Sequence, residues 1–230
     1  MKAIILAAGI GKRMRPLTDH LPKPLLEVAG QPLIVHHLRR LQNAGVTDVV
    51  INVSYLGHMI RDALGDGSDF GMNIHYSIEA EPLETGGALN KALSLLGDDP
   101  FLLINGDVWC DIPLGPLLQA RLQTGVLGHL VCVPNPDFKK VGDFSLLPVV
   151  GGASVLALRA ASDEGYTYSG ISVLSPKLIS SYPSRRVKFP LLEVFLWCLD
   201  SSALTAELYK GAWIDVGTPE RLTQLDALMQ

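Results

Sequence analysis

Residues 3–17 read AIILAAGIGKRMRPL, an apolar run that passes directly into a segment with Gly9, Gly11 and three basic residues. An uncharged run of this length is typical of a strand buried on both faces in a parallel sheet. The glycines let backbone N–H groups approach phosphate oxygens closely, and the forked guanidinium of Arg13 can bind two such oxygens at once. The stretch therefore predicts a buried strand followed by an anion-binding loop.

Two other glycine-rich loops do not match this spacing. A dinucleotide-binding fingerprint requires a third glycine at position 14, where the chain has Met14, and a P-loop requires serine or threonine where it has Arg13. Taken alone, the two glycines are also compatible with a simple turn after the strand.

Strand-like and helix-like segments alternate through the first half of the chain. Apolar strand-like runs lie at 3–8, 49–53, 74–78 and 101–105, and segments with helical periodicity lie at 32–43, 59–64 and 88–96. This alternation requires crossover connections and therefore predicts an α/β fold, with a mostly parallel sheet covered by helices on both faces.

The second half has shorter strand-like runs, which predict a mixed sheet. These runs lie at 130–133, 154–158, 167–173 and 204–209, and helices are expected at 191–199 and from Pro219 onward. We find no flexible linker between the halves, and we predict a single domain over 1–230 with one continuous sheet.

Composition limits the classes of partner. The chain has 230 residues, 48% of them hydrophobic, and a formal net charge of −4. A negative chain without a basic segment is a poor ligand for nucleic acid or an anionic membrane, and no apolar segment reaches the ~20 residues that span a bilayer. Cys110, Cys132 and Cys198 lack the spacing of a zinc site or disulfide framework, as is usual in a reducing compartment. We therefore expect a cytoplasmic protein that binds neither nucleic acid nor membrane.

A second basic segment, 21–26, reads LPKPLL and places Lys23 between two prolines. Each proline fixes its own φ and restricts the residue before it, so Lys23 starts from a constrained backbone. A pre-organised cation loses less entropy when it binds a phosphate. On its own the segment is equally compatible with a solvated lysine in a rigid loop.

Together the segments 6–17 and 21–26 resemble the signature of the sugar-phosphate nucleotidyltransferases, and the likeness continues through EPLETGG at 81–87, NGD at 105–107 and WIDVGT at 213–218. The resemblance implies a Rossmann-like three-layer sandwich with a mostly parallel mixed sheet, of the nucleotide-diphospho-sugar transferase type. It also implies dependence on magnesium. The chain departs from the family pattern at Lys12, where most members have threonine or serine, and this change affects a minor phosphate contact.

The resemblance also implies roles for individual residues. In the family pattern residues 1–111 bind the nucleotide and residues 112–230 bind the sugar phosphate, with Arg13 and Lys23 as the catalytic cations. The residues expected to contact the nucleotide are Leu6, Ala8, Gly9, Gly11, Lys12, Arg13, Lys23, Glu81 and Gly86.

Glu81 is the residue expected to select the base. A carboxylate only accepts hydrogen bonds, so Glu81 is suited to the N3–H of uracil or thymine, whereas adenine lacks a donor at the matching position. Guanine has such a donor at N1, so this chemistry leaves GTP open. The resemblance, with Gly86 close to the base, favours UTP. Glu79 and Glu84 are expected to be surface residues of the same loop.

Two aspartates are the expected metal ligands. Asp107 follows the strand-like run 101–105, and ligand sites of open α/β sheets collect at the carboxyl ends of strands. The resemblance makes Asp215 the second ligand, and Mg²⁺ is commonly held by one or two carboxylates together with substrate phosphates. Either aspartate considered separately is also typical of a helix cap or a turn.

The sugar phosphate is expected to bind residues that lie mainly in the second half. By resemblance these are Asn105, Gly142, Glu164, Ser169, Gly170 and Lys188, with Lys188 near the phosphate. The chain lacks the Glu-Lys-Pro element that most members carry before the pocket strand, so Glu164 is equally compatible with a plain loop residue.

The implied reaction joins a sugar 1-phosphate to UTP and releases pyrophosphate. No histidine has metal-type spacing and no serine or cysteine lies in a nucleophile elbow, but the sugar phosphate has a second pKa of ~6 and needs no general base. The whole-chain likeness favours N-acetylmuramate 1-phosphate and peptidoglycan recycling. Glucose 1-phosphate with UTP or dTTP, and mannose 1-phosphate with GTP, stay open.

Two functions of other classes compete with this interpretation. A nucleotide-sensing regulatory protein with the same fold would not need Asp107, Asp215, Arg13 and Lys23, all of which are present. A glycosyltransferase would need an Asp-x-Asp motif, and the acidic residues that follow position 106 do not have that spacing.

Overall fold

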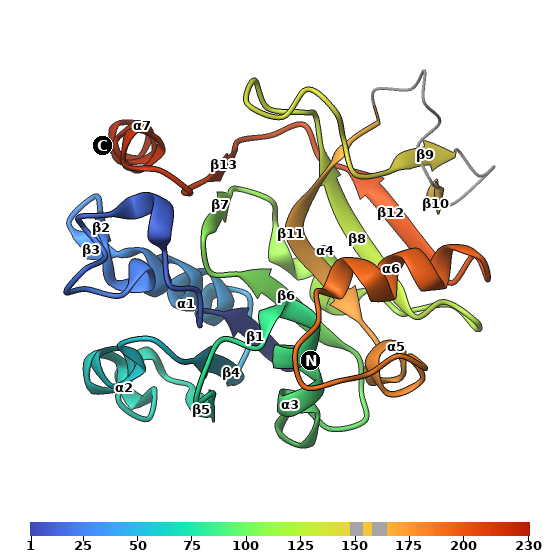
Figure 1. Cartoon of the computed structure of the whole chain (residues 1–230), viewed down its shortest axis with the longest axis horizontal. Coiled ribbons are helices and arrows are strands. Elements are labelled where there is room, and N and C mark those ends of the chain that lie inside the picture. The colour runs from blue at the N-terminus through green and yellow to red at the C-terminus, as the bar shows by residue number, and fades with distance from the viewer. Residues whose placement is uncertain (148–153, 158–164) are drawn as a thin grey trace.

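A central mixed sheet organises the molecule. The computed structural model describes residues 1–147, 154–157 and 165–230, and within them nine strands hydrogen-bond in the order β5-β4-β1-β6-β11-β8-β12-β10-β9 (Figure 1). Their bounds are β1 Ala3–Leu6, β4 Asp48–Val53, β5 Asn73–Ile78, β6 Phe101–Asn105, β8 Gly128–Val133, β9 Ser145–Leu147, β10 Ser154–Ala157, β11 Thr167–Leu174 and β12 Leu204–Leu208.

The first four strands of this order are parallel, as predicted. β1 pairs with β4 on one side and β6 on the other, and the register places Leu6 beside both Asn52 and Asn105. The carboxyl ends of these three strands therefore meet at one edge of the sheet, the edge where ligand sites of open α/β sheets form.

The second half of the chain extends the same sheet with mixed pairing, which confirms the predicted mixed sheet. β11 runs antiparallel to both β6 and β8, and β12 runs parallel to β8. Residue 158, the end of one predicted strand, lies outside the described residues.

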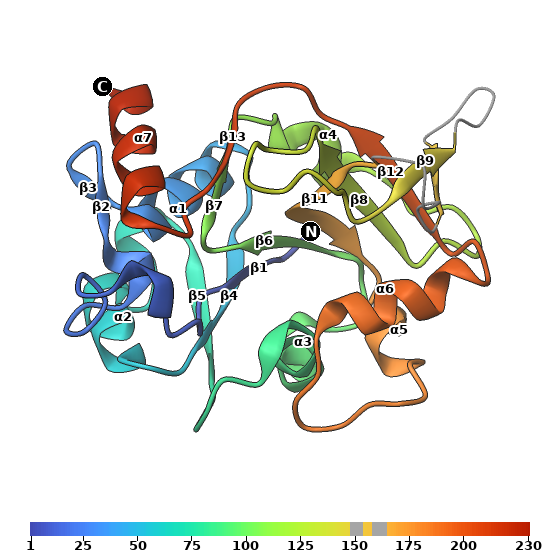
Figure 2. The same ribbon diagram turned by 45° about the horizontal axis from the view of Figure 1, so that its top comes forward.

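Helices cover both faces of the sheet, so the molecule has three layers. Along β1, Ala3 and Ile5 pack into one apolar cluster with α1, α2 and α4, whereas Ile4 packs into a second cluster with α3, α5 and α6. Figure 2 shows α3, α5 and α6 together on one side of the sheet. The helices are α1 Leu33–Asn43, α2 Gly57–Leu64, α3 Glu84–Leu96, α4 Leu114–Gln119, α5 Pro176–Ser180, α6 Leu191–Leu199 and α7 Pro219–Met229. The predicted three-layer fold is confirmed.

Two short two-stranded ribbons lie outside the central sheet, and the second of them joins distant parts of the chain. β2 (Glu27–Val28) pairs with β3 (Gln31–Pro32), and β7 (Val108–Cys110) pairs antiparallel with β13 (Trp213–Asp215). The second ribbon carries the segment before α7 back to the carboxyl end of β6.

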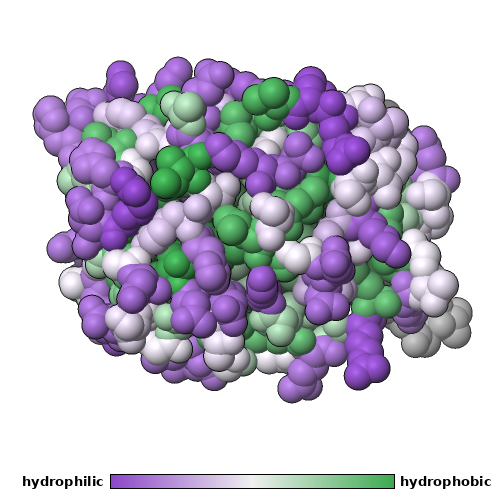
Figure 3. Space-filling view, turned by 90° about the horizontal axis from the view of Figure 1, so that it is seen from below, coloured by the Kyte–Doolittle hydropathy of each residue, from purple (hydrophilic) through white to green (hydrophobic). Residues whose placement is uncertain are grey.

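The surface hydropathy and the state of the cysteines bear on the expectations from composition. On the face seen in Figure 3, hydrophobic residues are interspersed with hydrophilic ones. Cys110, Cys132 and Cys198 are buried free thiols, in agreement with a sequence spacing that fits no disulfide framework. Among the helices that the structure describes, none combines the length and hydropathy needed to span a membrane.

Helix α3 begins at Glu84, four residues before the predicted start, because tertiary packing offsets the low helix propensity of two glycines. The backbone N–H groups of Gly86 and Gly87 donate to the carbonyl of Phe189 at 2.9 and 3.0 Å. A Cβ at Gly86 would lie 2.5 Å from the buried Phe189 ring. These glycines let the segment before α6 pack directly on the first turn of α3.

Gly86→Ala is expected to lower the free energy of unfolding by about 2 kcal/mol, because the added methyl overpacks against Phe189. Gly115→Ala is the matched control, since a Cβ at this glycine of α4 meets nothing within 4 Å. The control should leave stability unchanged or raise it by about 0.5 to 1 kcal/mol. Urea unfolding measures both variants, and equal midpoints would refute the packing role of Gly86.

Candidate active site

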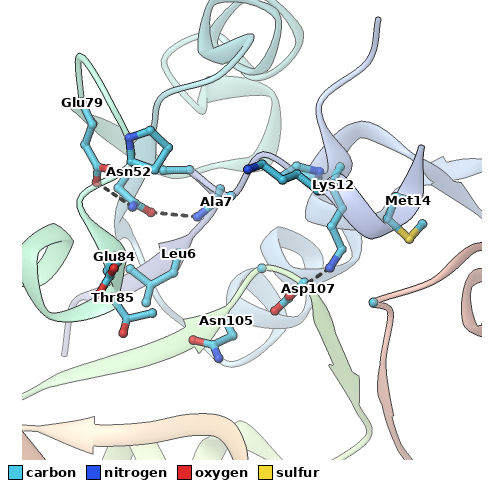
Figure 4. A pocket seen from close by; sticks show the side chains of 18 of the residues that line it. Leu6, Ala7, Lys12, Met14, Asn52, Glu79, Glu84, Thr85, Asn105 and Asp107 are labelled. Carbon is cyan, nitrogen blue, oxygen red and sulfur yellow. Dashed lines mark hydrogen bonds and ion pairs between the residues drawn. The ribbon is translucent and has the colours of Figure 1, made fainter. Parts of the chain in front are cut away.

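A cavity of about 370 Å³ lies at the carboxyl edge of β1, β4 and β6 (Figure 4). Its lining comes from segments far apart in the sequence, which the sheet brings together. The lining residues are Leu6, Ala7, Ala8, Gly9, Gly11, Lys12, Arg13, Met14, Lys23, Pro24, Asn52, Glu79, Pro82, Leu83, Glu84, Thr85, Asn105, Gly106, Asp107 and Gly217.

The loop after β1 turns sharply at Gly11. This glycine has a φ of 68°, and a Cβ there would lie 3.0 Å from Thr18 Cγ2 and 3.3 Å from Lys23 Cβ. Its carbonyl accepts hydrogen bonds from the Thr18 hydroxyl and from the Met14 N–H, both at 2.8 Å. Glycine is required here for its backbone conformation and for the close approach of Lys23.

All the residues predicted from the first loop line the cavity. Leu6, Ala8, Gly9, Gly11, Lys12 and Arg13 contribute to its wall, with Lys12 and Arg13 on the single-turn 3₁₀ helix Lys12–Met14. Arg13 is exposed and makes no ion pair with a described residue, so its guanidinium is available to an anion.

Lys23 and Asp107 form an ion pair inside the cavity. Lys23 lies on the 3₁₀ turn Lys23–Leu25, and its Nζ is 2.9 Å from Asp107 Oδ2. The lysine side chain is 10% exposed and the aspartate side chain 43%. A lysine this buried requires a charged partner, and Asp107, just after β6, provides it.

Asp215 approaches the same region from β13, although it is not itself part of the cavity wall. The Val216 N–H donates to the Asp107 carbonyl at 2.8 Å, which holds the backbones near the two aspartates together. Asp215 Oδ2 pairs with Arg221 Nη1 at 2.9 Å. Gly217, which lines the cavity, lies against the other oxygen, since a Cβ there would be 2.9 Å from Asp215 Oδ1.

The donor set at this place suits a hard divalent cation. Asp107 and Asp215 each use Oδ2 in an ion pair, and within the described residues neither Oδ1 has a protein partner. The described part of the chain contains no group of three or more histidine, cysteine, aspartate or glutamate residues suited to a metal. Two carboxylates with free oxygens fit Mg²⁺, which keeps several waters and binds phosphate as well.

A buried polar chain fixes the other wall of the cavity, and sequence analysis missed it. Asn52 Oδ1 accepts from the Ala7 N–H at 2.8 Å, Asn52 Nδ2 donates to Glu79 Oε1 at 2.8 Å, and Glu79 Oε2 accepts from the Leu83 N–H at 3.0 Å (Figure 4). The prediction that Glu79 lies on the surface is wrong: it is buried because two donors satisfy its carboxylate. The signal was an asparagine inside the apolar run 49–53.

The segment predicted to contact the base reaches the cavity only in part. Pro82, Leu83, Glu84 and Thr85 line it, whereas Glu81 is exposed and outside the lining. Gly86 also lies outside the lining, because its α-carbon faces the Phe189 ring.

The residues predicted for the sugar phosphate are dispersed. Asn105 lines the cavity, and Gly170, with a φ of 84°, leaves room for it, since a Cβ there would lie 2.8 Å from Asn105 Nδ2. Ser169 is fully buried, and its hydroxyl accepts from the Ile171 N–H at 3.1 Å.

Gly142 and Lys188 do not line the cavity. Gly142 packs on the Tyr166 backbone, and the exposed Lys188 has its α-carbon beside Gly87. Glu164 lies outside the described residues.

His37, below the turn after β6, does not supply acid–base chemistry. Burial lowers the pKa of His37 to about 3, and the positive charge of Arg40 acts in the same direction. The imidazole is therefore neutral at physiological pH.

Comparison with known proteins shows the family of this chain. Residues 2–142 match the nucleotidyl transferase family. The N-acetylmuramate alpha-1-phosphate uridylyltransferase of Neisseria meningitidis serogroup B is 46% identical over 99% of this chain and 98% of its own length. The mannose-1-phosphate guanyltransferase of Hypocrea jecorina is 41% identical over 96% of this chain, which spans only 62% of that protein.

Solved structures share the fold over the whole chain. HddC from Yersinia pseudotuberculosis superposes with a TM-score of 0.78 at 26% identity, covering 100% of this chain and 99% of that one. A putative glucose-1-phosphate thymidylyltransferase from Bacillus anthracis superposes with a TM-score of 0.85 at 24% identity, covering 99% and 94%. The glycine loop, Lys23 and Asp107 lie together at the carboxyl edge of the sheet. On the family match and the 46% identity, the chain belongs to the nucleotidyl transferase family.

Proposed function

We propose that this protein transfers the uridylyl group of UTP to N-acetylmuramate 1-phosphate, yielding the UDP-sugar and pyrophosphate, in peptidoglycan recycling. The observation that carries the proposal is the 46% identity to the Neisseria uridylyltransferase over nearly the full length of both chains. The guanyltransferase relatives support the same reaction class with a different base and sugar. A cytoplasmic location, where UTP is available, is part of the proposal.

The proposed reaction is an in-line displacement that needs no proton transfer. An oxygen of the sugar 1-phosphate bonds to the α-phosphorus of UTP, and the bond from that phosphorus to the bridging oxygen of the β-phosphate breaks. The attacking phosphate is already largely dianionic at neutral pH because its second pKa is ~6. This chemistry agrees with a cavity whose described lining residues include no histidine.

The main barrier is the repulsion between two anions, and the cations of the cavity lower it. Lys23 and Arg13 line the same wall as Gly9 and Gly11, so a triphosphate there would meet two positive charges and the N–H groups of the loop. Lys23 is held by Asp107 and is therefore oriented before substrate binds. Positioning and electrostatics are the expected source of catalysis.

We infer that Asp107 and Asp215 hold Mg²⁺ through the Oδ1 atoms that lack protein partners. The ion would neutralise charge on the phosphates during displacement. Their pairing with Lys23 and Arg221 limits the rotation of both carboxylates.

We propose that residues 1–111 bind the nucleotide and residues 112–230 bind the sugar phosphate. Every lining residue of the cavity except Gly217 belongs to 1–111, which supports this part as the nucleotide-binding half. We propose that Glu81, beside the lining residue Pro82, accepts the N3–H of uracil, with Gly86 shaping the wall behind it. The sugar phosphate is assigned to Gly142, Glu164, Ser169, Gly170 and Lys188, with Asn105 between the two substrates.

A substrate panel tests the proposal. Purified protein with Mg²⁺ is offered N-acetylmuramate, glucose or mannose 1-phosphate, each with UTP, dTTP or GTP, and pyrophosphate release is followed with product masses. The account predicts the highest kcat/KM for UTP with N-acetylmuramate 1-phosphate. Preference for mannose 1-phosphate with GTP would replace the proposed substrates, and tight UTP binding without turnover on any sugar would indicate a sensor.

A further inference from the structure

Arg221, in the first turn of α7, binds the second predicted metal ligand. Its Nη1 is 2.9 Å from Asp215 Oδ2, and the two side chains are only 12% and 21% exposed. The position of the guanidinium is set locally, because Thr218 caps α7 by accepting the Arg221 N–H at 3.4 Å. The start of α7 thus places the Arg221 side chain next to the Asp215 carboxylate.

The guanidinium of Arg221 also contacts the ring of Phe138. The Arg221 Cζ lies 4.1 Å from the centroid of the Phe138 ring, within the range of a cation–π contact. Phe138 itself is 56% exposed, so the ring contacts the arginine at the surface and not within a core. The carboxylate at Nη1 and the ring over Cζ both limit the rotation of the guanidinium.

Phe138 belongs to the segment between β8 and β9, which runs beside the approach to β13 (Figures 1 and 2). The segment is braced by Lys139, whose Nζ pairs with Asp143 at 2.6 Å, and Asp143 Oδ2 accepts the Tyr168 N–H at 2.9 Å. The contact between Phe138 and Arg221 therefore connects the start of β11 to Asp215.

Three charged groups converge at Gly217, on the cavity wall. A Cβ at this glycine would lie 2.6 Å from Arg221 Nη2, 2.9 Å from Arg13 Nη2 and 2.9 Å from Asp215 Oδ1. Arg221 occupies Oδ2 of the carboxylate, so the oxygen without a partner among the described residues, Oδ1, is the one that lies next to Gly217. The ion pair thus selects which oxygen of Asp215 is presented at the edge of the cavity.

We propose that Arg221 is a positioning residue that holds the Asp215 carboxylate with Oδ1 directed at the cavity, and that Phe138 acts through Arg221. The inference rests on the proposed function, because it takes Asp215 as a ligand of the catalytic cation. Groups that orient a metal ligand typically change metal affinity or activity by about 10- to 100-fold. A carboxylate already fixed in its binding orientation loses less entropy when the cation arrives.

The first test compares Arg221→Gln with Arg39→Gln, an exposed arginine of α1. We expect Arg221→Gln to lower kcat by about 10- to 100-fold, with a change of less than about threefold in KM for UTP, and the control to leave both unchanged. Binding of Mn²⁺ in the presence of UTP, followed by the electron paramagnetic resonance signal of the free ion, should weaken by a similar factor. Arg221→Lys keeps the charge without the fork, and its expected loss is intermediate.

The second test asks whether Phe138 works through the arginine. Phe138→Leu keeps an apolar side chain without the ring, and kcat should fall by about 2- to 5-fold in the native background, the value of an exposed cation–π contact. In the Arg221→Gln background the same change should have no further effect, because the contact is already lost.

The outcomes separate this inference from the proposed function. Unchanged or tighter Mn²⁺ binding in Arg221→Gln would show that the arginine does not orient the ligand, and additive effects of the two substitutions would disconnect Phe138 from it. Thermal unfolding identifies a merely structural loss, and if Arg221→Gln does not fold, Arg221→Lys gives the same comparison. Native protein that turns over no sugar phosphate but binds Mn²⁺ with UTP would refute the function while the resonance measurement still tests Arg221.

Discussion

Asp107→Asn is expected to reduce turnover by about 100- to 1,000-fold while the protein stays folded. The asparagine keeps an oxygen near Lys23 Nζ, which now lies 2.9 Å from Asp107 Oδ2, so local packing is preserved. It removes the negative charge that a hard cation requires, and with it the charge neutralisation that lets two phosphates meet. The loss should appear in kcat at saturating UTP and sugar 1-phosphate.

Asp215→Asn should show a loss of the same order, because the two carboxylates act on one ion. The matched control for both variants is Asp98→Asn, an exposed aspartate after α3. Initial rates of pyrophosphate release across a Mg²⁺ titration measure the effect, with circular dichroism to verify the fold. Near-native turnover in either variant would remove that aspartate from the mechanism.

Lys23→Met is expected to lower kcat/KM by about 100- to 1,000-fold, comparable with the loss of one pre-organised electrostatic contact in other active sites. Methionine fills a similar volume in the 3₁₀ turn, where Lys23 is buried, so the substitution removes charge with little change in packing. The effect has two sources: the triphosphate loses a cation, and Asp107 loses the partner that orients it.

The control for this prediction is Lys91→Met, on the exposed face of α3. Both variants are compared in steady-state assays with UTP as the varied substrate, and raising the salt concentration should not reproduce the loss in the native protein. Equal activity of the two variants would show that the lysine between the prolines has no catalytic role.

The parallel core could be predicted because its signals are local. β1, β4 and β6 are largely apolar, as is typical of parallel strands buried on both faces, and their polar residues lie at or next to the strand ends. The start of α3 could not be predicted in this way. Gly86 and Gly87 disfavour a helix locally, and the segment around Phe189, far along the sequence, supplies contacts that stabilise it.

The lining residues that come from one continuous segment could be predicted from the sequence. Those that are brought together by strand pairing could not. The loop with Gly11 and Arg13 was identified from its own composition, and it lines the cavity. Asn52 and Glu79 meet because β4 and β5 are neighbours in register, which no local pattern encodes. The proximity of Asp215 to Asp107 likewise depends on the pairing of β13 with β7, and sequence alone suggested it only through family resemblance.

The most direct test is a crystal structure with a non-hydrolysable UTP analogue and Mn²⁺, in which anomalous scattering locates the ion. The account predicts that the ion contacts Asp107 and Asp215 together with the α-phosphate, and that the triphosphate lies against Gly11 and Lys23. A triphosphate bound elsewhere, or an ion that neither aspartate contacts, would contradict the account.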